Sequence, residues 1–442
     1  MFHAFKGGIR PPLRKELTGN SSLENLSVPQ VCYLPLKQDS GNPAVPVVKA
    51  GDSVDEGELV AAGECAGSAN IHASVPGRVV DIAGLPTVYG VQPVIIIEAE
   101  GAFGKTGKAG NTGSWENLSR DELFKKVRDA GLVRLSGEGC ACDLDGTYRP
   151  DKKTDTLIIN CTAVEPYITS DEILIRTHAE EIIEGILIAL KILDASKAVI
   201  AVNDRNSDAA LTIAGALGNR RSASAITIKK IKNRYPAGAE KQIVFGTLGR
   251  VIKSGQTAAG AGVSVHDVAT IFALREAVVF DKPLIERYIT VSGGMIGIPG
   301  NYKVRIGTRI GDIAEECGGL KGKASRVIIG GTLTGTAVTD MNIPVVKGTS
   351  AILFLSDGEA YAGESGTCIR CGRCIRVCPM GLMPCRIASA LSRGDMTGAS
   401  DFHPEMCIMC GSCSYICPAH IPLVHLINRF NSKDYEINPG PV

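Results

Sequence analysis

The sequence contains no apolar run long enough to cross a bilayer. The longest run, residues 182–193, includes Glu184 and Lys191 and is shorter than the roughly 18 residues that a spanning helix requires. The first residues, MFHAFKGGIRPP, lack the apolar core of a signal peptide. The net charge is only +1, so no basic excess points to nucleic acid. We therefore expect a cytoplasmic protein that associates at most peripherally with a membrane.

The N-terminal segment alternates short apolar strands with Gly-Asp and Pro-Gly turns, as in PVVKAGDSVDEGELVAAG and ANIHASVPGRVVDI. This pattern resembles the barrel-sandwich fold of biotinyl and lipoyl carriers. Those carriers present a modifiable lysine at a hairpin tip, where this chain has Ala69, Asn70, Ile71 and His72. Because the lysine is missing, we expect a structural platform and no swinging arm.

Strands and helices alternate in the next segment. Buried-strand patterns cover residues 155–161, 197–203 and 224–231, and residues 207–217 form a helix pattern. Thr177 and Glu180 have the spacing of a capping box ahead of the apolar run. This order predicts an α/β domain with a parallel sheet. From about residue 286 to 349, short strands with glycine turns indicate a small β-grasp-like domain.

Nine of the 15 cysteines lie between Cys368 and Cys417, and eight of them form two runs of the pattern C-x2-C-x2-C-x3-C-P. This is the spacing of bacterial ferredoxins with two clusters. The first three thiolates of a run hold one [4Fe–4S] cluster, and the fourth reaches the other cluster. We therefore predict one cluster on Cys368, Cys371, Cys374 and Cys417, and a second on Cys407, Cys410, Cys413 and Cys378.

Structural zinc is the alternative use of these cysteines. Zinc sites close a single tetrahedron, often from isolated C-x2-C pairs, so two three-plus-one runs favour iron and sulfur. Cys385 is one cysteine beyond this requirement, and we expect it to be a small buried apolar side chain.

The two runs differ in charge. Four arginines surround the first run, whereas no charge lies between the cysteines of the second; they are Arg370, Arg373, Arg376 and Arg386. Because net charge tunes cluster potential, we expect the Cys368 cluster to have the higher potential. Alternatively, the arginines form a docking face for an acidic partner, and both roles can hold together.

In order along the chain, a series of motifs resembles the RnfC subunit of the Rnf ion-translocating complex. The motifs are FKGGIRPP…KELT, VVKAGDSVDEG…IHASVPG, DTLIIN…EPYITSD, YPAGAEKQ, KPLIER…TVSGG, PGNYKVRIGT, NIPVVKGTSAIL and the two cysteine runs. The α/β, β-grasp and cysteine-rich regions are also similar to the flavin-bearing, NADH-oxidising subunit of respiratory complex I.

The resemblance implies a multidomain α+β protein. Its parts are a barrel-sandwich hybrid, a Rossmann-like α/β domain, an SLBB-like β-grasp domain and a helical ferredoxin-like domain with two [4Fe–4S] clusters, over residues 1–110, 115–285, 286–352 and 357–430. It also implies a subunit on the cytoplasmic face of the membrane. Such a subunit takes a hydride from NADH onto FMN and passes electrons to its clusters, in exchange with ferredoxin-linked, ion-pumping partners.

The flavin site departs from the family pattern. The glycine-rich loop G-x-G-G-A-G-F-P-T keeps only Gly137 and Gly139, and Glu138 places negative charge where a phosphate would lie. In the motif N-G-A-E-C-E-P-Y, Ala163 replaces the first glutamate, while Glu165 remains. We therefore expect FMN and NADH binding to be weakened or lost, and the chain's own NADH oxidation with it.

Cys140 and Cys142 stand in this altered loop as a C-x-C pair. They are either a redox-active dithiol or two unrelated thiols. The family includes paralogues outside the membrane complex, such as the electron-transfer protein associated with proline reductase. The second hypothesis is therefore a soluble paralogue that delivers electrons to a thiol- or selenol-dependent reductase. A third is a scaffold that keeps clusters for stability alone.

Overall fold

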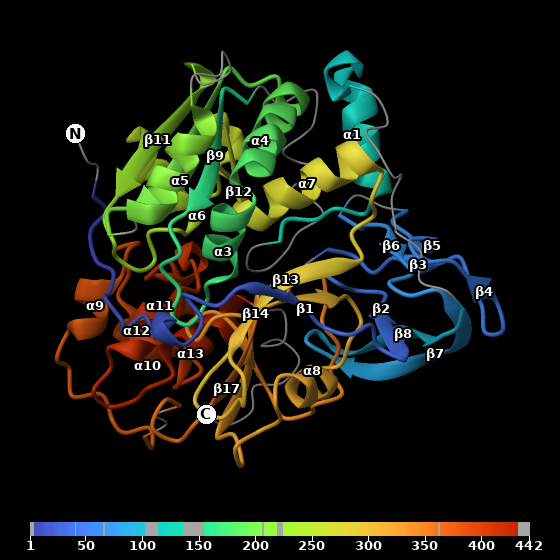
Figure 1. The fold of residues 1–442 in the computed structure, drawn as a ribbon. Coiled ribbons are helices and arrows are strands. Elements are labelled where there is room, and N and C mark those ends of the chain that lie inside the picture. The colour runs from blue at the N-terminus through green and yellow to red at the C-terminus, as the bar shows by residue number, and fades with distance from the viewer. Residues whose placement is uncertain are drawn as a thin grey trace.

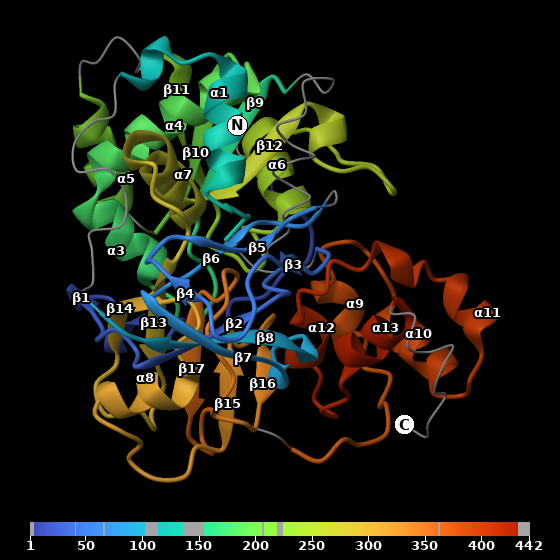
Figure 2. The ribbon, with the colours of Figure 1, turned by 90° about the vertical axis from the view of Figure 1, so that its right-hand side faces the viewer.

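The structure is a computed structural model that describes residues 4–39, 41–64, 67–101, 114–135, 154–205, 207–218, 224–360 and 363–431 (Figure 1). Figure 2 shows how the parts of the molecule are arranged. An α/β part lies above two β-rich parts, and a helical cysteine-rich part stands to one side. No helix in the described ranges has the length and apolarity needed to cross a bilayer.

The α/β part contains a four-stranded parallel sheet in the order β11-β10-β9-β12, which confirms the parallel sheet that the sequence predicts. The predicted strand 197–203 and helix 207–217 match the observed limits. The sequence patterns missed β12 and the helices α1, α3, α6 and α7. The bounds are α1 Arg120–Asp129, β9 Thr156–Cys161, α3 Ser170–Thr177, α4 Ala179–Leu193, β10 Lys197–Asn203, α5 Ser207–Leu217, β11 Ile226–Ile231, α6 Glu240–Leu248, β12 Val263–Asp267 and α7 Val268–Phe280.

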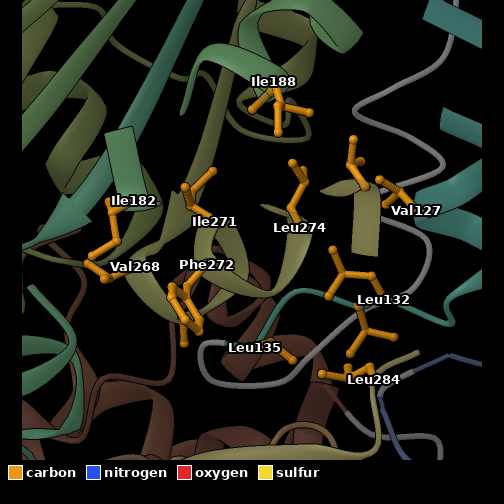
Figure 3. Close-up of a cluster of buried hydrophobic side chains, with 14 of the residues drawn as sticks. Val127, Leu132, Leu135, Ile182, Ile188, Val268, Ile271, Phe272, Leu274 and Leu284 are labelled. Carbon is orange, nitrogen blue, oxygen red and sulfur yellow. The ribbon is translucent and has the colours of Figure 1, made fainter. Parts of the chain in front are cut away.

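The largest apolar core of this part lies where α1, α4 and α7 meet. Val127 of α1, Ile188 of α4 and Leu274 of α7 are buried and gather in one cluster (Figure 3). Leu132 and Leu135 extend this core along the segment that follows α1. The chain therefore leaves α1 along the buried side of the α/β part, toward the carboxyl ends of the parallel strands.

The start of α4 differs from the expected capping box. His178, and not Thr177, occupies the N-cap position. The Thr177 hydroxyl instead donates to the carbonyl of Ile173 (2.9 Å), inside the preceding helix α3. The Thr177 hydroxyl, which the sequence pattern assigned to the start of α4, is thus used at the end of α3. Helix α3 ends at Thr177 and α4 begins at Ala179, so this residue lies at the boundary of both helices.

The N-terminal part is built from two small sheets, in the orders β2-β8-β7-β4 and β3-β5-β6. The hairpin tip at Asn70 is packed and not free. The Asn70 side-chain amide donates to the backbone carbonyl of Asp129 (3.3 Å), and the Asn70 backbone carbonyl accepts from the Lys347 ammonium group. The bounds are β2 Val31–Pro35, β3 Val45–Pro46, β4 Ser53–Val54, β5 Leu59–Ala62, β6 Ile71–His72, β7 Gly77–Thr87 and β8 Gly90–Ala99.

A six-stranded sheet follows, in the order β1-β14-β13-β17-β15-β16, with α8 on it. Its edge strand β1 comes from the beginning of the chain and pairs in parallel with β14. The bounds are β1 Leu23–Asn25, β13 Glu286–Ser292, β14 Gly300–Arg305, α8 Ile310–Glu316, β15 Arg326–Ile329, β16 Thr336–Val338 and β17 Ala351–Leu355.

The cysteine-rich part contains only short helices. They are α9 Arg373–Val377, α10 Pro384–Leu391, α11 Met396–Ser400, α12 Ser412–Tyr415 and α13 Leu423–Asn431. Its apolar side chains form two small clusters, and cysteines are members of both. Cysteines therefore lie where a larger domain would place its hydrophobic core.

Candidate metal centres and the loop beside them

The two cysteine runs have the same backbone conformation. Gly372 and Gly411 both adopt positive φ (69° and 71°), and Arg370 and Met409, two residues earlier, do so as well (57° and 52°). Each glycine is the N-cap of a short helix, α9 in the first run and α12 in the second. Left-handed backbone favours glycine, which explains its place after the second cysteine of each run.

A cavity with about 340 Å³ of empty space, part of it open to solvent, lies between the two runs. Its lining includes Cys407, Cys410 and Cys413 of the second run and Cys378, the last cysteine of the first. These are the four residues that the three-plus-one pattern assigns to one cluster. The Leu382 backbone N–H donates a hydrogen bond to the Cys378 sulfur (3.3 Å). Hydrogen bonds of this kind orient and tune the sulfur ligands of metal sites.

On the other side, Cys374 of the first run packs in one apolar cluster with Cys413 and Cys417 of the second run and with Cys385. Cys368 and Cys371 are exposed. Cys385 is only partly buried, contrary to expectation, and the Cys374 thiol is hydrogen-bonded to it.

Burial raises the pKa of three cavity thiols, Cys407, Cys410 and Cys413, and so favours their protonated form. Burial, reinforced by the neighbouring thiols, raises the pKa of Cys413 to about 12. It also raises the pKa of Cys407 to about 11. A metal must displace these protons to bind, because the ligand is the thiolate. The donor set is all sulfur, which suits an iron–sulfur cluster.

The second run is packed against the rest of the molecule. The Tyr235 hydroxyl donates to the carbonyl of Cys410 (2.7 Å). The Gln242 amide lies 3.4 Å from the Met380 sulfur, beside the same cavity. The N-terminal segment crosses the end of α9, where the Gly8 N–H donates to the carbonyl of Val377 (2.7 Å).

The loop between β15 and β16, residues 330–335, also reaches the second run. A Cβ atom placed on Gly411 would lie 2.6 Å from the Leu333 carbonyl oxygen. On its other side, the same loop is held by Glu165, whose carboxylate accepts the Leu333 N–H (3.0 Å). Glu165 also fills the space over Gly331, where a Cβ atom would collide with it.

The carboxyl group of Glu165 is desolvated. Burial raises its pKa to about 7, although the Leu333 N–H and the charge of Lys15 favour the carboxylate. Of the residues proposed from the sequence for a flavin site, Glu165 is the one that the structure describes. Gly137, Gly139, Cys140 and Cys142 lie outside the described residues. Sequence reasoning missed Tyr235 and Leu333, although Tyr235 opens the YPAGAEKQ motif.

The residues around the carboxyl ends of β9 and β12 do not fit the phosphate of FMN. Asp267 caps α7 by accepting from the N–H and hydroxyl of Thr270 (both 2.7 Å), so a carboxylate already occupies this helix start. Burial and the nearby Asp267 raise the pKa of Asp171 to about 7. The one buried arginine here, Arg287, donates to the carbonyls of Thr349 and Leu135. Within the described residues, this end of the sheet offers negative charge and no phosphate cradle.

Four family models match the chain. They are the RnfC barrel sandwich hybrid domain over residues 3–102, the Nuo51 FMN-binding domain over 127–276, the SLBB domain over 288–337 and the 4Fe-4S dicluster domain over 362–418. The barrel-sandwich, α/β, β-grasp and ferredoxin-like fold classes predicted from the sequence are thereby confirmed. The match of the FMN-binding model covers most of the α/β part.

Relatives of known name match most of the chain. The C subunit of the proton-translocating ferredoxin:NAD(+) oxidoreductase complex of Clostridium ljungdahlii is 35% identical, over 90% of this chain and 86% of its own length. The C subunit of the Na(+)-translocating ferredoxin:NAD(+) oxidoreductase complex of Acetobacterium woodii is 35% identical, over 88% and 87%. The C subunit of the ion-translocating oxidoreductase complex of Rhodobacter capsulatus is 36% identical, over 90% and 76%.

A solved structure shares the fold. The crystal structure of an NAD+-reducing [NiFe]-hydrogenase in the H2-reduced state matches with a TM-score of 0.50 and 19% identity, over 74% of this chain and 64% of that one. At this identity the match speaks for the arrangement of the elements.

Proposed function

This chain belongs to the family of C subunits of ion-translocating ferredoxin:NAD(+) oxidoreductase complexes, and we propose that it relays electrons through two [4Fe–4S] clusters. The observation that carries the proposal is the cavity shared by Cys378 and the three leading cysteines of the second run. When bound, the clusters supply one-electron redox chemistry. The protein holds them, orients them and controls how far water reaches each one.

The proposed ligand sets are those of the three-plus-one pattern. Cys407, Cys410, Cys413 and Cys378 hold the cluster next to the α/β part. Cys368, Cys371, Cys374 and Cys417 hold the other. Support for the crossing comes from the cavity that Cys378 of the first run lines together with Cys407, Cys410 and Cys413. Iron–sulfur clusters are favoured over zinc, because each run supplies three closely spaced cysteines and sends its fourth to the other run, whereas a structural zinc site closes one tetrahedron.

The electron partners follow from the relatives' names. They are the other subunits of an ion-translocating complex and carriers linked to ferredoxin and NAD. We propose that the chain acts on the cytoplasmic face of the membrane as a peripheral subunit. We also propose that its FMN and NADH binding is weakened or lost, because Ala163 stands where the family motif has its first glutamate and the glycine-rich loop keeps only Gly137 and Gly139.

We further propose that the domains cover residues 1–110, 115–285, 286–352 and 357–430. The C-x-C pair Cys140 and Cys142 is a candidate dithiol, and it would serve the alternative function, delivery of electrons to a thiol- or selenol-dependent reductase.

The crossing is tested with Cys378→Ala. The protein is reconstituted anaerobically, and iron, sulfide and flavin are counted alongside EPR spectra of the reduced state. Wild type should hold about eight irons and no flavin. Cys378→Ala should lose the cluster of the second run and keep the cluster of its own run. The matched control is Cys385→Ala in the same part of the chain, which should keep both.

The opposite results are equally clear. Loss of the first run's cluster in Cys378→Ala would refute the crossed assignment. Zinc, or about four irons in wild type, would refute the relay. One tightly held FMN per chain would refute the loss of the flavin site.

A further inference from the structure

The two proposed centres differ in their exposure to solvent. Cys410 of the second run is buried against the α/β part, and Cys413 is buried within the cysteine-rich part, whereas Cys368 and Cys371 of the first run are exposed. Electron transfer between proteins requires a centre near the surface. If the relay proposed above operates, the first run is therefore its outer end.

The surface around this outer end carries a strong local charge. Between Gly363 and Arg393 the sequence has five arginines, no lysine and one acidic residue, Glu364, although the whole chain has a net charge of only +1. The arginines are Arg370, Arg373, Arg376, Arg386 and Arg393, and all of them are exposed. Among the described residues, none of the first four forms an ion pair.

The arginines are arranged as a surface. Arg373 and Arg376 are three residues apart on α9, so they share a face of that helix, which lies at the edge of the molecule in Figure 1. Arg370 precedes this helix with positive φ (57°), and Arg386 lies on the neighbouring helix α10. Ile369, which directly precedes Arg370 in the sequence and lies between the two exposed cysteines, is 67% exposed.

Exposed arginines together with an exposed apolar residue have the composition of a protein interface. Arginine is enriched and lysine depleted at such interfaces, and the apolar centre supplies the area that becomes buried. A cationic rim accelerates the encounter with a partner of opposite charge. Anionic lipid would also meet these arginines, but a membrane over Cys368 and Cys371 would close the outer end of the relay.

We propose that Arg370, Arg373, Arg376 and Arg386, together with the exposed Ile369, form the docking surface for an acidic redox protein. This surface is named here the arginine rim. In the docked complex one electron passes between the partner's redox centre and the Cys368 cluster, so that one is oxidised as the other is reduced. The proposal rests on the relay function and adds the order of the centres along the electron path. The inner cluster lies beside the α/β part, and the outer cluster exchanges electrons with the partner.

The test uses the full, reconstituted chain and a recombinant two-cluster ferredoxin with an acidic surface as the probe. Binding is measured by titration calorimetry at low and high ionic strength. Arg373→Glu/Arg376→Glu should weaken binding at least about ten-fold at low salt, because it reverses two charges of the rim. Wild-type affinity should fall as salt is added. Arg373→Lys/Arg376→Lys keeps the charge and should retain most of the affinity.

The matched control reverses two exposed cations elsewhere. Lys321→Glu/Lys323→Glu lies between α8 and β15, on the far side of the molecule from the cysteine-rich part (Figure 2), and should bind as wild type does. Equal affinity of the rim variant and wild type would overturn the proposal. So would an equal loss in the control, or a wild type that binds anionic phospholipid vesicles through the rim and does not bind the ferredoxin.

Cluster content separates this proposal from the relay itself. Iron counts and EPR signals after dithionite reduction are recorded for every variant. Wild type with reducible clusters and no rim-dependent binding would overturn the docking surface and leave the relay standing. Rim-dependent binding by a protein without reducible clusters would overturn the relay and leave the docking surface standing.

Discussion

At the scale of single residues, the carboxyl group of Glu165 joins two regions that the sequence keeps far apart. It lies between the loop 330–335 and the α/β part, and Tyr235, whose hydroxyl binds the Cys410 carbonyl, is close enough to interact with it electrostatically. Burial favours the neutral form of this carboxyl group, so its protonation is linked to folding.

Glu165→Gln should remove a pH dependence from the stability of the protein. The folded pKa is about 7, above the ordinary value of 4.5, so wild type is stabilised below about pH 4.5 and loses this contribution as the pH rises toward 7. Glutamine keeps an acceptor for the Leu333 N–H and does not ionise. Urea unfolding at pH 5 and pH 8 should show wild type losing up to roughly 3 kcal/mol relative to the variant.

A control with the opposite sign is available in Glu359→Gln. Burial opposes ionisation of Glu359, but hydrogen bonds from Ser356, Gly294 and Tyr167 outweigh it and lower its pKa. The contribution of ionised Glu359 to the free energy of unfolding is therefore present at neutral pH and lost on acidification. If the difference between wild type and Glu165→Gln were the same at pH 5 and pH 8, Glu165 would be an ordinary ionised carboxylate.

At the scale of elements, the repeated cysteine runs provide a natural comparison. Gly372 and Gly411 have nearly the same φ, yet a Cβ atom on Gly372 would meet nothing within 4 Å, whereas one on Gly411 would meet the Leu333 carbonyl at 2.6 Å. The two runs therefore share a local conformation and differ in what packs against it.

Gly411→Ala should destabilise the protein more than Gly372→Ala. Both substitutions place a side chain in left-handed backbone, at a cost of roughly 1 kcal/mol. Only the first must also displace the loop 330–335, which adds about 1–3 kcal/mol. The difference in unfolding free energy between the two variants isolates the loop contact. Equal effects would mean that the loop does not press on the second run.

Lys347 connects three parts of the chain. It lies just before β17, is 1% exposed, and donates to the carbonyls of Asn70 in the N-terminal hairpin and Gly131 after α1. Burial lowers its pKa to about 8. Lys347→Met should leave two buried carbonyls without a donor and destabilise the protein by roughly 2–5 kcal/mol. Urea unfolding measures the loss of stability, with the exposed Lys321→Met as control. Equal stability of the two variants would contradict a stabilising role for the two hydrogen bonds of Lys347.

At the scale of the whole molecule, the placement of the cysteine-rich part makes the two centres unequal. One face of it contacts the N-terminal segment, Tyr235 and the loop 330–335, and the other carries the exposed Cys368 and Cys371. Two centres with the same ligand pattern thus experience different access to water.

An iron chelator should therefore dismantle the two clusters in sequence. The Cys368 cluster should lose iron first, because two of its proposed ligands, Cys368 and Cys371, are exposed, and the inner cluster should persist. Iron release over time, followed by EPR of the reduced protein, distinguishes the steps. Single-phase release of all iron, or earlier loss of the inner cluster, would contradict the unequal burial.

Much of this architecture was accessible from residue spacing. The strand at 197–203, the helix at 207–217 and the parallel sheet follow from local periodicity, which depends on side chains close together in the sequence. The N-cap of α4 was wrong because Thr177 had a competing partner, Ile173, one turn earlier in α3. The pairing of β1 with β14 was missed, because it joins residues that lie almost 280 positions apart.

The sequence by itself determined the kind of chemistry, because cluster ligation depends on the spacing of a few thiolates along a short segment. It also determined the family, through motifs in a constant order. Only the tertiary structure decided which cysteines are buried and which are exposed, that Glu165 and Leu333 connect the α/β part to the second run, and that Lys347 joins three parts. These features arise from contacts between segments hundreds of residues apart, and no local pattern records such contacts.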